Sequence, residues 1–563
     1  MDNKLSYVSG VSDKPLLGLT IGEMLDKTAK SHKDNMALIS IHQNIKWTYK
    51  QLKEEVDNCA LALYAGGLRR NDRIGIWSMN RAEWMVVQYA SAKLGAILVN
   101  INPSYRIHEL KYALIQSECK FLVYDEKTKH SDYFAMLNEL MPNLKYATKG
   151  KLNSIVIPEL TTIISLGNDQ EKGIFTWSEY MKKAKTVSPD ILDAIAKELT
   201  FDQAINIQYT SGTTGFPKGA TLSHHNILNN GYFVTESLHL KPNDRMIIPV
   251  PLYHCFGMVM GNLGCLTHGS TVIYTSRAFE PEEIIKSIEK QEATILYGVP
   301  TMFNTILNHP SINDFNVKSL RGGIMAGAIC PVQLMEQVQD IFEMEDMQIA
   351  YGMTETSPVS TQTTSDAPFD KKVSTVGTVH PHQEVKLIDP STGLVVPIGE
   401  KGELCTRGYS VMLGYWNDEK KTRESIDSAR WMHTGDLATM DENGYINIVG
   451  RIKDMIIRGG ENVYPKEIEA YLRTHPKVDN VSVIGVPDEI YGEAIMAWIK
   501  LYDDTKLSEK ELTDFCTGKI AHFKIPKYFK FVAECPKTVT GKIRKVEMRK
   551  KSVIELGLTD VVN

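Results

Sequence analysis

The sequence predicts an α/β protein with a large N-terminal domain, in which helices wrap parallel-rich sheets, followed by a β-rich subdomain and a small α+β domain. Three observations lead to this prediction. Apolar strand segments alternate with helical segments up to about residue 300, which is typical of parallel sheets covered by helices. From about Glu384 the pattern changes to short β segments and turns. Finally, a chain of 563 residues is longer than a single core usually holds.

Apolar spacing places the elements of the first part. Thr48 and Gln51 form a capping-box pattern, and the apolar helical face that follows runs to Leu63, where Gly66-Gly67 ends it. Segment 145–165 has no such pattern and is expected to be irregular and peripheral. The other expected helices are 21–30, 81–94, 107–117, 258–267 and 280–290, and the expected strands are 36–41, 74–77, 96–101, 120–124, 205–209, 246–250, 270–274 and 294–297.

The later part divides in two. The strings EVKLID, GELCTRG, WMHTGDLATM and YINIVGR predict a β-rich subdomain at about 375–451. The last hundred residues predict a compact α+β unit with helices at 465–473 and 508–518 and strands at 480–486, 495–501 and 529–533. We therefore place the domain boundary after Arg451, with an N-terminal domain at 1–451 and a C-terminal domain at 452–563.

Composition excludes several classes of protein. The content is 43% hydrophobic and 23% charged, and the formal net charge is -5, so no basic face for nucleic acid is expected. Eight cysteines are scattered without C-x-x-C pairs, which argues for a reducing compartment and against disulfides or structural zinc. The longest apolar stretch, 246–266, is interrupted by prolines and is read as core. Cytoplasmic location is expected, and a homo-oligomer is left open.

The segment YTSGTTGFPKGA at 209–220 combines glycines, hydroxyls and a lysine. Glycines let backbone amides turn toward an anion and Lys218 adds a positive charge, so the segment predicts a phosphate loop. A surface turn rich in glycine and serine is the structural alternative. A Walker loop is excluded, because Pro217 precedes Lys218 and Gly219-Ala220 follow it.

Two further strings carry chemistry. YGMTETSP at 351–358 offers an aromatic face in Tyr351, a hydroxyl in Thr354 and a hard oxygen ligand for magnesium in Glu355. HTGDLATM at 433–440 places Asp436 in a tight turn. The structural alternatives are an ordinary turn at the end of a strand for the first string and a turn-stabilising aspartate for the second.

Four weaker strings complete the set. A charged turn begins GRIKDMIIRGGENVYPKEIE at 450–469, and PKTVTGKIRK at 536–545 is a basic turn that contains Lys542. PLYHCFG at 251–257 sets His254 among apolar residues, and MAGA at 325–328 is a loop of small residues. The structural alternatives are solvent-exposed turns for the charged strings and, for His254, a core histidine whose hydrogen bonds are made within the protein.

In this order and at these distances, the strings resemble the AMP-forming adenylate superfamily, which includes acyl-CoA synthetases, adenylation domains and beetle luciferases. The resemblance spans roughly residues 40 to 550. GATLSHHNI, RGYSVMLGYW and KDMIIRGGENVYP are most similar to the medium-chain fatty acyl-CoA synthetases, in the branch called acyl-CoA synthetase family member 2. The resemblance implies ATP, Mg²⁺ and coenzyme A as ligands and a mobile C-terminal domain.

The resemblance also assigns roles to residues. Catalysis falls to Lys542, Lys218, His254 and Glu355, with Glu355 as the magnesium ligand. Lys453 is the hinge, Gly459 and Gly460 line the coenzyme A path, and the acyl pocket comprises His254, Met258, Met302, Met325 and Gly352. The nucleotide is expected to contact Thr210, Ser211, Gly212, Thr213, Thr214, Gly215, Phe216, Pro217, Lys218, Gly327, Ala328, Tyr351, Gly352, Thr354, Asp436, Arg451 and Lys542.

The implied function is ATP-dependent ligation of a fatty acid, of medium chain length, to coenzyme A through an acyl-adenylate. An aryl-CoA ligase and a luciferase-like oxygenase share every motif and remain alternatives. A nucleotide-binding regulator without turnover is an alternative of another class, and the presence of Lys542, Glu355 and Asp436 speaks against it. Animal members of the branch carry a mitochondrial leader, so the mitochondrial matrix is the alternative location if a leader has been removed.

Overall fold

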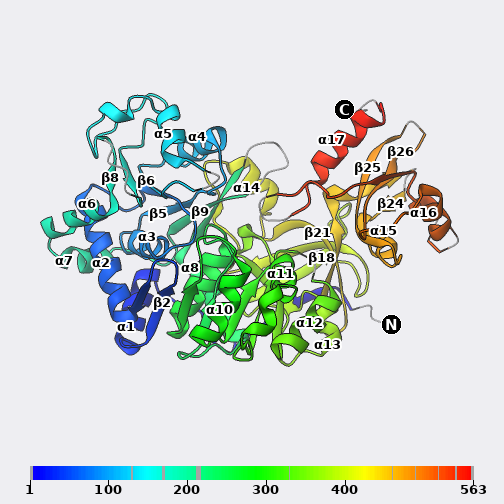
Figure 1. Ribbon diagram of the computed structural model, residues 1–563, viewed down its shortest axis with the longest axis horizontal. Coiled ribbons are helices and arrows are strands. Elements are labelled where there is room, and N and C mark those ends of the chain that lie inside the picture. Colours follow the sequence, from blue (N-terminus) through cyan, green and yellow to red (C-terminus); the bar gives the residue numbers. More distant parts are fainter. Residues whose placement is uncertain are drawn as a thin grey trace. The chain divides into compact units, whose positions relative to one another are not determined.

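Figure 1 shows the computed structural model of the chain, coloured from the N-terminus to the C-terminus. The structure describes residues 4–128, 131–167, 172–210, 217–328, 330–458, 461–488, 490–517, 519–520, 522–538 and 542–558. The chain divides into a larger unit, residues 8–385 and 406–432, and a smaller unit, residues 1–7, 386–405 and 433–563. The predicted boundary after Arg451 falls inside the smaller unit and stays a prediction.

The larger unit contains an eight-stranded sheet. Its strand order is β20-β10-β9-β5-β4-β6-β7-β8, and the six strands from β9 to β8 are parallel, whereas β10 runs antiparallel to both of its neighbours. The bounds are β4 (Arg73–Trp77), β5 (Ile97–Asn100), β6 (Phe121–Tyr124), β7 (Thr162–Ser165), β8 (Phe175–Thr176), β9 (Ala204–Thr210), β10 (Lys218–Ser223) and β20 (Gly414–Tyr415).

A nine-stranded sheet in the same unit also has a parallel centre. Its order is β17-β16-β15-β14-β13-β11-β12-β2-β3, with antiparallel pairs only at the two ends. The bounds are β2 (Met36–Ser40), β3 (Ile45–Thr48), β11 (Arg245–Ile247), β12 (Thr271–Tyr274), β13 (Ile295–Gly298), β14 (Gly322–Ala326), β15 (Asp346–Gly352), β16 (Val359–Gln362) and β17 (Thr378–Val379).

Helices cover both faces of the two sheets, as the alternating sequence pattern predicts. One core cluster joins strands of both sheets through α1, α2, α3 and α8. A second packs α10, α11 and α12 on the other face of the nine-stranded sheet, where they lie side by side in green in Figure 1. The bounds are α1 (Ile21–Ser31), α2 (Tyr49–Ala65), α3 (Ala82–Lys93), α4 (Ile107–Gln116), α5 (Tyr133–Leu140), α6 (Trp177–Met181), α7 (Asp190–Ala196), α8 (His224–Ser237), α9 (Gly264–His268), α10 (Pro281–Gln291), α11 (Pro300–Leu307), α12 (Val332–Phe342), α13 (Phe369–Ser374) and α14 (Glu419–Ser425).

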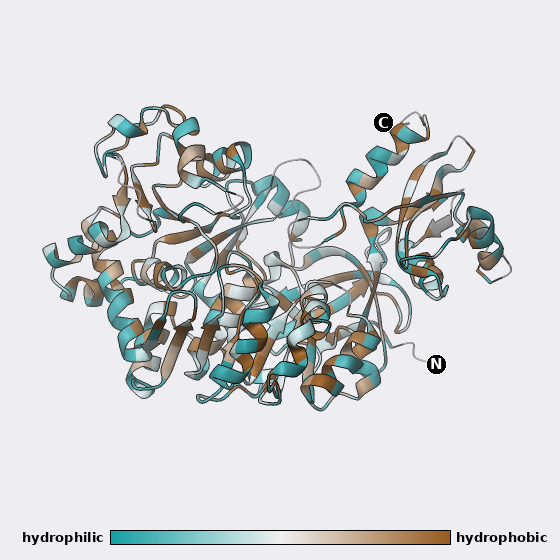
Figure 2. Cartoon of the chain, viewed as in Figure 1, coloured by the Kyte–Doolittle hydropathy of each residue, from teal (hydrophilic) through white to brown (hydrophobic). Residues whose placement is uncertain are grey.

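Burial explains why these segments become helices. The capping box predicted at Thr48 and Gln51 is present at the start of α2. In α10, Ile284, Ile285 and Ile288 are buried, while the charged residues point outward. Figure 2 shows the corresponding pattern, with brown strands inside and teal turns on the outer helices. The hydrophobic effect therefore selects the helix faces that the sequence pattern predicted.

Segment 145–165 is not peripheral throughout, contrary to the prediction. Its last four residues form β7, which is fully buried and pairs in parallel with β6. The strand was missed because a buried central strand of four residues shows no alternation of polar and apolar side chains.

Segment 256–263 is a π-helix, η3 (Phe256–Leu263), which continues into α9. An ordinary helix was predicted here. Close packing accompanies the wide turn, because a Cβ at Gly257 would lie 2.6 Å from the Pro251 carbonyl oxygen, and one at Gly261 would lie 2.4 Å from Ile248 Cδ1. π-Helical turns occur frequently at functional sites.

The four β strings predicted near the C-terminal part form one sheet with an N-terminal strand. Its order is β1-β18-β19-β21-β22. The bounds are β1 (Tyr7–Ser9), β18 (Gln383–Ile388), β19 (Gly402–Gly408), β21 (Met432–Met440) and β22 (Ile446–Arg451).

The rest of the smaller unit is the predicted α+β arrangement. The sheet order is β24-β23-β26-β25, with β27 beside β26. Its elements are η6 (Ile452–Asp454), β23 (Ile456–Arg458), β24 (Glu461–Val463), α15 (Pro465–Arg473), β25 (Val478–Asp488), β26 (Gly492–Leu501), α16 (Glu509–Cys516), β27 (Tyr528–Phe531) and α17 (Lys545–Glu555).

Two global features bear on the sequence predictions. All eight cysteines are free thiols, and seven are buried. Among the described residues, no helix combines the length and the apolar character needed to cross a lipid bilayer.

Candidate active site

The predicted phosphate loop connects two paired strands of the larger unit. β9 ends at Thr210, β10 begins at Lys218, and these two residues are register partners in an antiparallel pair. The pairing holds Thr210 and Lys218 side by side, so β9 and β10 form a β-hairpin. Pro217 precedes β10, while the predicted contacts of Ser211, Gly212, Thr213, Thr214, Gly215 and Phe216 lie outside the described residues.

Glu355 lies beside the ends of this hairpin. Its residue is only 5% exposed, in a short 3-10 turn, η5 (Thr354–Thr356), which follows β15. One carboxylate oxygen, Oε1, accepts a hydrogen bond from Thr210 Oγ1 at 3.2 Å and another from the Tyr415 hydroxyl at 2.8 Å. Two segments 145 positions apart in the chain are thus joined at a buried carboxylate.

Tyr415 links Glu355 to Lys218. The Lys218 Nζ lies 3.3 Å from the Tyr415 hydroxyl oxygen and 4.4 Å from the centroid of its ring. Burial raises the pKa of Tyr415, and the neighbouring Glu355 charge raises it further, so the phenol stays protonated and donates to the carboxylate. The sequence analysis did not single out Tyr415. Its signal was present in the quoted string RGYSVMLGYW, but a tyrosine after a glycine indicates no role by itself.

The carboxylate oxygens of Glu355 are ligands of the kind that magnesium prefers. No described residue donates a hydrogen bond to the second carboxylate oxygen of Glu355, whereas Oε1 receives two. Mg²⁺ prefers hard oxygen ligands and is usually held by one or two carboxylates together with substrate phosphates and water. Glu355 is suited to that role because its other oxygen is held fixed.

Two of the predicted nucleotide segments lie at neighbouring strand ends. β14 and β15 are parallel partners with Ala326 opposite Ala350, so Gly327-Ala328 and Tyr351-Gly352 follow the same edge of the nine-stranded sheet. Ligands of open α/β sheets bind outside the carboxyl ends of the strands. The structure therefore places Gly327-Ala328 and Tyr351-Gly352 at the same edge of the sheet.

Gly352 has a packing reason to be glycine. A Cβ there would lie 1.8 Å from the carbonyl oxygen of Pro358, a backbone atom on the adjacent strand segment. The absence of a side chain at Gly352, a residue that the sequence analysis placed in the acyl pocket, is therefore required by the close approach of two backbones.

His254 is a buried imidazole with an unsatisfied nitrogen. Its Nε2 is buried and has no hydrogen-bond partner among the described residues, and its ring centroid lies 4.3 Å from that of Tyr253. Burial lowers the pKa of His254 to about 4, so the ring is neutral at physiological pH. An unpaired buried nitrogen is costly, and a ligand group that hydrogen-bonds to it would remove that cost.

The predicted acyl-pocket methionines do not all share one core. Met258 belongs to the core cluster between the two sheets, and Met302 packs against it. Met325 belongs to the cluster on the opposite face of the nine-stranded sheet, because its neighbours Ile324 and Ala326 point the other way along β14. The structure thus separates Met325 from the other two methionines.

In the smaller unit, Asp436 and Arg451 form an ion pair. They are register partners on the antiparallel strands β21 and β22, and Arg451 Nε donates to Asp436 Oδ1 at 2.8 Å. Asp436 is 7% exposed. The bond to the guanidinium group orients the Asp436 carboxylate.

The other predicted residues of the smaller unit lie in turns. Lys453 is exposed in η6, the short turn between β22 and β23. Lys542 is exposed where a turn closes, with its backbone N–H donating to Thr538 Oγ1 at 3.1 Å and its carbonyl accepting from the Thr538 N–H at 2.7 Å. Gly459 and Gly460 lie outside the described residues.

Comparison with known proteins identifies the family. The model of the AMP-binding enzyme family matches residues 25–416, and the model of the AMP-binding enzyme C-terminal domain matches residues 467–542. The protein YngI of Bacillus subtilis (strain 168), described as an acyl-CoA synthetase, is 45% identical over 97% of this chain and 99% of its own. The chain belongs to the AMP-binding enzyme family.

Other relatives agree with this assignment. The mitochondrial medium-chain acyl-CoA ligase ACSF2 of Homo sapiens is 42% identical, over 98% of this chain and 91% of its own. Among solved structures, the anthranilate CoA ligase AuaEII in complex with anthranoyl-AMP is 25% identical with a TM-score of 0.83, covering 97% of this chain and 99% of its own. The predicted fold and the predicted class, an AMP-forming acyl-CoA synthetase, are thereby confirmed.

Proposed function

We propose that this acyl-CoA synthetase joins a medium-chain fatty acid to coenzyme A at the expense of ATP, with an acyl-adenylate as the intermediate. The observation that carries the proposal is the buried Glu355 carboxylate, held between the hairpin of the predicted phosphate loop and Tyr415. The names of two relatives support the choice of acid and intermediate, because one is a medium-chain acyl-CoA ligase and the other holds anthranoyl-AMP.

The reaction has two steps. A carboxylate does not react with a thiol directly because the leaving group would be hydroxide. In the first step a carboxylate oxygen attacks the α-phosphorus of ATP, a new P–O bond forms and the bond to pyrophosphate breaks. In the second step the thiol of coenzyme A loses its proton, its sulfur attacks the acyl carbonyl, and AMP leaves with the electron pair of the acyl C–O bond.

The larger unit supplies charge compensation for the first step. Lys218 and the loop amides would bind the phosphates, while Tyr415 holds both Lys218 and Glu355 in place. Glu355 would hold magnesium, which would supply positive charge against the phosphates. Phosphoryl-type transfer depends mainly on positioning and electrostatic stabilisation, which this group of residues provides without a covalent nucleophile.

In this proposal the smaller unit binds the ribose of ATP and changes position between the two steps. Asp436, oriented by Arg451, suits the two ribose hydroxyls because a carboxylate accepts two hydrogen bonds at once. Lys542 would bridge the fatty acid carboxylate and the α-phosphate. Rotation about Lys453 would then replace Lys542 with the segment that contains Gly459 and Gly460 for the second step.

We assign the acyl chain to the region of His254, Met258 and Met302. The neutral imidazole of His254 would face the carboxylate end, and its unpaired Nε2 supports a polar partner there. Flexible thioethers adapt to aliphatic chains of different shape. Met325 is left out because it packs on the other face of the sheet.

We propose a reducing compartment, the cytoplasm or the mitochondrial matrix, as the place of action. The free thiols of all eight cysteines support it. The homo-oligomer stays an open prediction.

The test is pyrophosphate release with straight-chain acids of about two to about sixteen carbons, because differences in kcat/KM measure the binding of each added methylene. We expect release to depend on acid and magnesium, with the highest kcat/KM for acids of medium length. A matched aromatic acid serves as the competitor. A preference for the aromatic acid would favour an aryl-CoA ligase, and ATP binding without pyrophosphate release would favour the non-catalytic regulator.

A further inference from the structure

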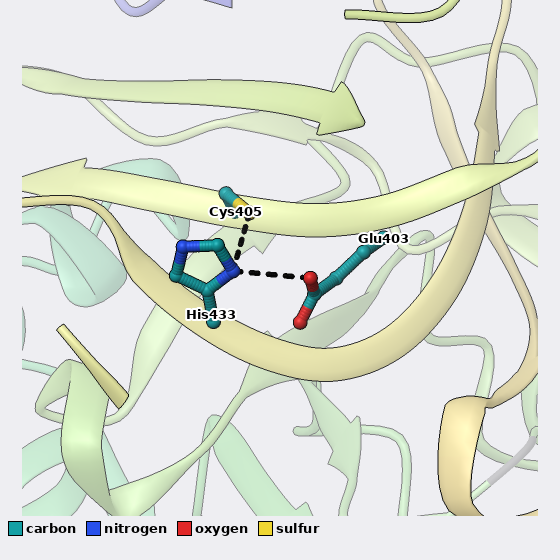
Figure 3. A group of neighbouring side chains, drawn as sticks. All are labelled: Glu403, Cys405 and His433. Atoms are coloured by element: carbon teal, nitrogen blue, oxygen red, sulfur yellow. Dashed lines mark hydrogen bonds and ion pairs between the residues drawn. The ribbon is translucent and has the colours of Figure 1, made fainter. Parts of the chain in front are cut away.

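A hydrogen-bonded group in the smaller unit has no part in the chemistry above. Figure 3 shows Glu403, Cys405 and His433 facing one another from β19 and β21. The Nδ1 of His433 lies 3.0 Å from Glu403 Oε2 and 3.6 Å from Cys405 Sγ. These residue types also bind zinc, but the distances equal those of ordinary hydrogen bonds, and the group is accounted for without an ion.

The second oxygen of Glu403 reaches the turn that precedes Asp436. Oε1 accepts a hydrogen bond from the backbone N–H of Gly435 at 3.1 Å. Gly435 has a φ of +69°, in the left-handed region, so the direction of its amide depends on an unusual backbone conformation. Glu403 therefore holds the one residue of the turn that has the greatest conformational freedom.

The whole turn is tied to β19. Thr434 Oγ1 donates to the Leu404 carbonyl oxygen at 2.7 Å and accepts from the Asp436 N–H at 3.1 Å. Glu403 holds His433 on one side and Gly435 on the other. Each residue from His433 to Asp436 thus has a hydrogen bond to β19, directly or through Thr434.

The contacts of the Glu403 carboxylate are made within the protein. Its side chain is 10% exposed, and both oxygens are engaged with β21. Hydrogen bonds from N–H groups to carboxylates are about twice as strong as those between neutral groups. A lost bond of this kind would leave the amide of Gly435 without its acceptor and Asp436 without a fixed orientation.

We propose that Glu403 is a positioning residue for recognition of the ribose: it fixes the 433–436 turn so that the Asp436 carboxylate meets the two ribose hydroxyls in the correct orientation. The inference rests on the proposed function, in which Asp436 binds those hydroxyls. It adds a residue that does not itself contact the ribose, and its loss should weaken only the binding of nucleotides that carry the ribose hydroxyls.

The experiment compares ATP with 2′,3′-dideoxy-ATP in pyrophosphate release. We expect Glu403→Ala to raise the KM for ATP by about tenfold, the effect of one lost charge-assisted hydrogen bond, and to change the KM for the dideoxy analogue less than threefold. Glu403→Gln retains an oxygen for the Gly435 amide and should restore most of the preference for ATP. Asp436→Ala should abolish the preference.

A matched control separates positioning from stability. Glu469 is another buried carboxylate of the same unit that accepts a backbone N–H, from Val483 at 2.8 Å, and pairs with Lys545. Glu469→Ala should lower the Tm of the protein while the ratio of the two KM values stays at the wild-type value. Thermal unfolding of every variant checks that the fold is retained.

The possible results distinguish the two proposals. If Glu403→Ala weakens both nucleotides equally, or if Glu403→Gln fails to restore the ratio, the positioning role is overturned while Asp436 keeps its own. If Asp436→Ala itself leaves the ratio unchanged, the ribose assignment fails, and the role of Glu403 fails with it.

Discussion

At the scale of single residues, the larger unit is organised around the buried carboxylate of Glu355. Its Oε1 accepts hydrogen bonds from Thr210 and Tyr415, and we propose that the carboxylate also binds magnesium. His254 is also buried, and its Nε2 has no hydrogen-bond partner among the described residues. Buried polar atoms without partners are rare in folded proteins because each one costs free energy. Their presence in the region of the predicted motifs is a physical argument for a ligand.

Removing the Tyr415 hydroxyl should weaken adenylation. Tyr415→Phe deletes the donor to Glu355 and the contact with Lys218, so kcat/KM for pyrophosphate release should fall by about tenfold, as expected for a hydrogen bond to a charged group. Tyr180→Phe is the matched control, because the buried Tyr180 hydroxyl has no partner among the described residues. An equal loss in both variants would contradict a specific role for Tyr415.

Buried histidines should make the protein less stable as pH falls. Burial lowers the pKa of His224 to about 3, of His254 to about 4 and of His380 to about 3. In the unfolded chain these groups take up protons below about pH 6.5, so the unfolded state binds more protons and stability falls between pH 6.5 and 4. Each histidine contributes a slope of about 1.4 kcal/mol per pH unit at most.

The measurement is the Tm at pH 7 and at pH 5. We expect a lower Tm at pH 5, and a smaller difference for His254→Gln, which removes one of the three groups. An unchanged pH dependence in that variant would show that His254 binds its proton at the same pH in the folded and in the unfolded chain, and would contradict the lowered pKa.

At the scale of elements, strand ends and one irregular helix place the site. The β9-β10 register closes the loop, and the parallel β14-β15 pair sets two further loops on one sheet edge. The π-helix η3 begins two residues after His254 and contains Met258. Its wide turn brings Gly257 against the backbone at Pro251, where no side chain fits.

Gly257→Ala should therefore destabilise the protein and disturb the acyl site together. The new Cβ would lie 2.6 Å from a backbone oxygen, and forced overpacking costs about 1–3 kcal/mol. Thermal unfolding and the KM for the acid measure the two effects. Gly18→Ala is the control, because its Cβ would meet Phe201 at an ordinary 3.6 Å. A Tm equal to that of the control would contradict the packing argument.

At the scale of the whole molecule, the proposed residues divide between two units. Lys218, Glu355, Tyr415 and His254 belong to the larger unit, and Asp436, Arg451, Lys453 and Lys542 belong to the smaller one. One family model matches residues 25–416, which include all four residues named from the larger unit, and the other matches residues 467–542, which include Lys542. In the function proposed above, the smaller unit serves both steps of the reaction by moving between them.

Lys542→Ala separates the steps. Without the ammonium group, charge on the α-phosphate is uncompensated, so pyrophosphate release should fall by at least about a hundredfold. Thioester formation from added acyl-adenylate and coenzyme A should persist. If the second step is lost to the same extent, the role assigned to Lys542 is wrong.

Lys453→Pro should give the opposite result. Proline restricts φ and removes a backbone N–H, so it limits rotation in η6. We expect pyrophosphate release to continue and thioester formation to fall. Lys453→Ala keeps the backbone free and should retain both steps. Full thioester turnover in the proline variant would exclude a hinge at this position.

Pattern and motif account for much of the fold. The capping box of α2, the helix faces and the parallel strands follow from local spacing of apolar residues, which is a property of the chain itself. β7 and the π-helix escaped prediction, because a short buried strand shows no alternation and a π-turn depends on contacts with other segments. The order of the motifs and their spacing along the chain also identified the enzyme family, without any knowledge of distances in space.

By itself, then, the sequence determined the fold class, the family and the residue types available for the reaction. Only the tertiary structure decided which side chains act together. Tyr415 joined Glu355, Met325 separated from Met258, and Glu403 reached the turn of Asp436. The physical reason is that hydrogen bonds and packing act over a few ångströms between segments far apart in the chain, and such proximity leaves no periodic trace in the order of residues.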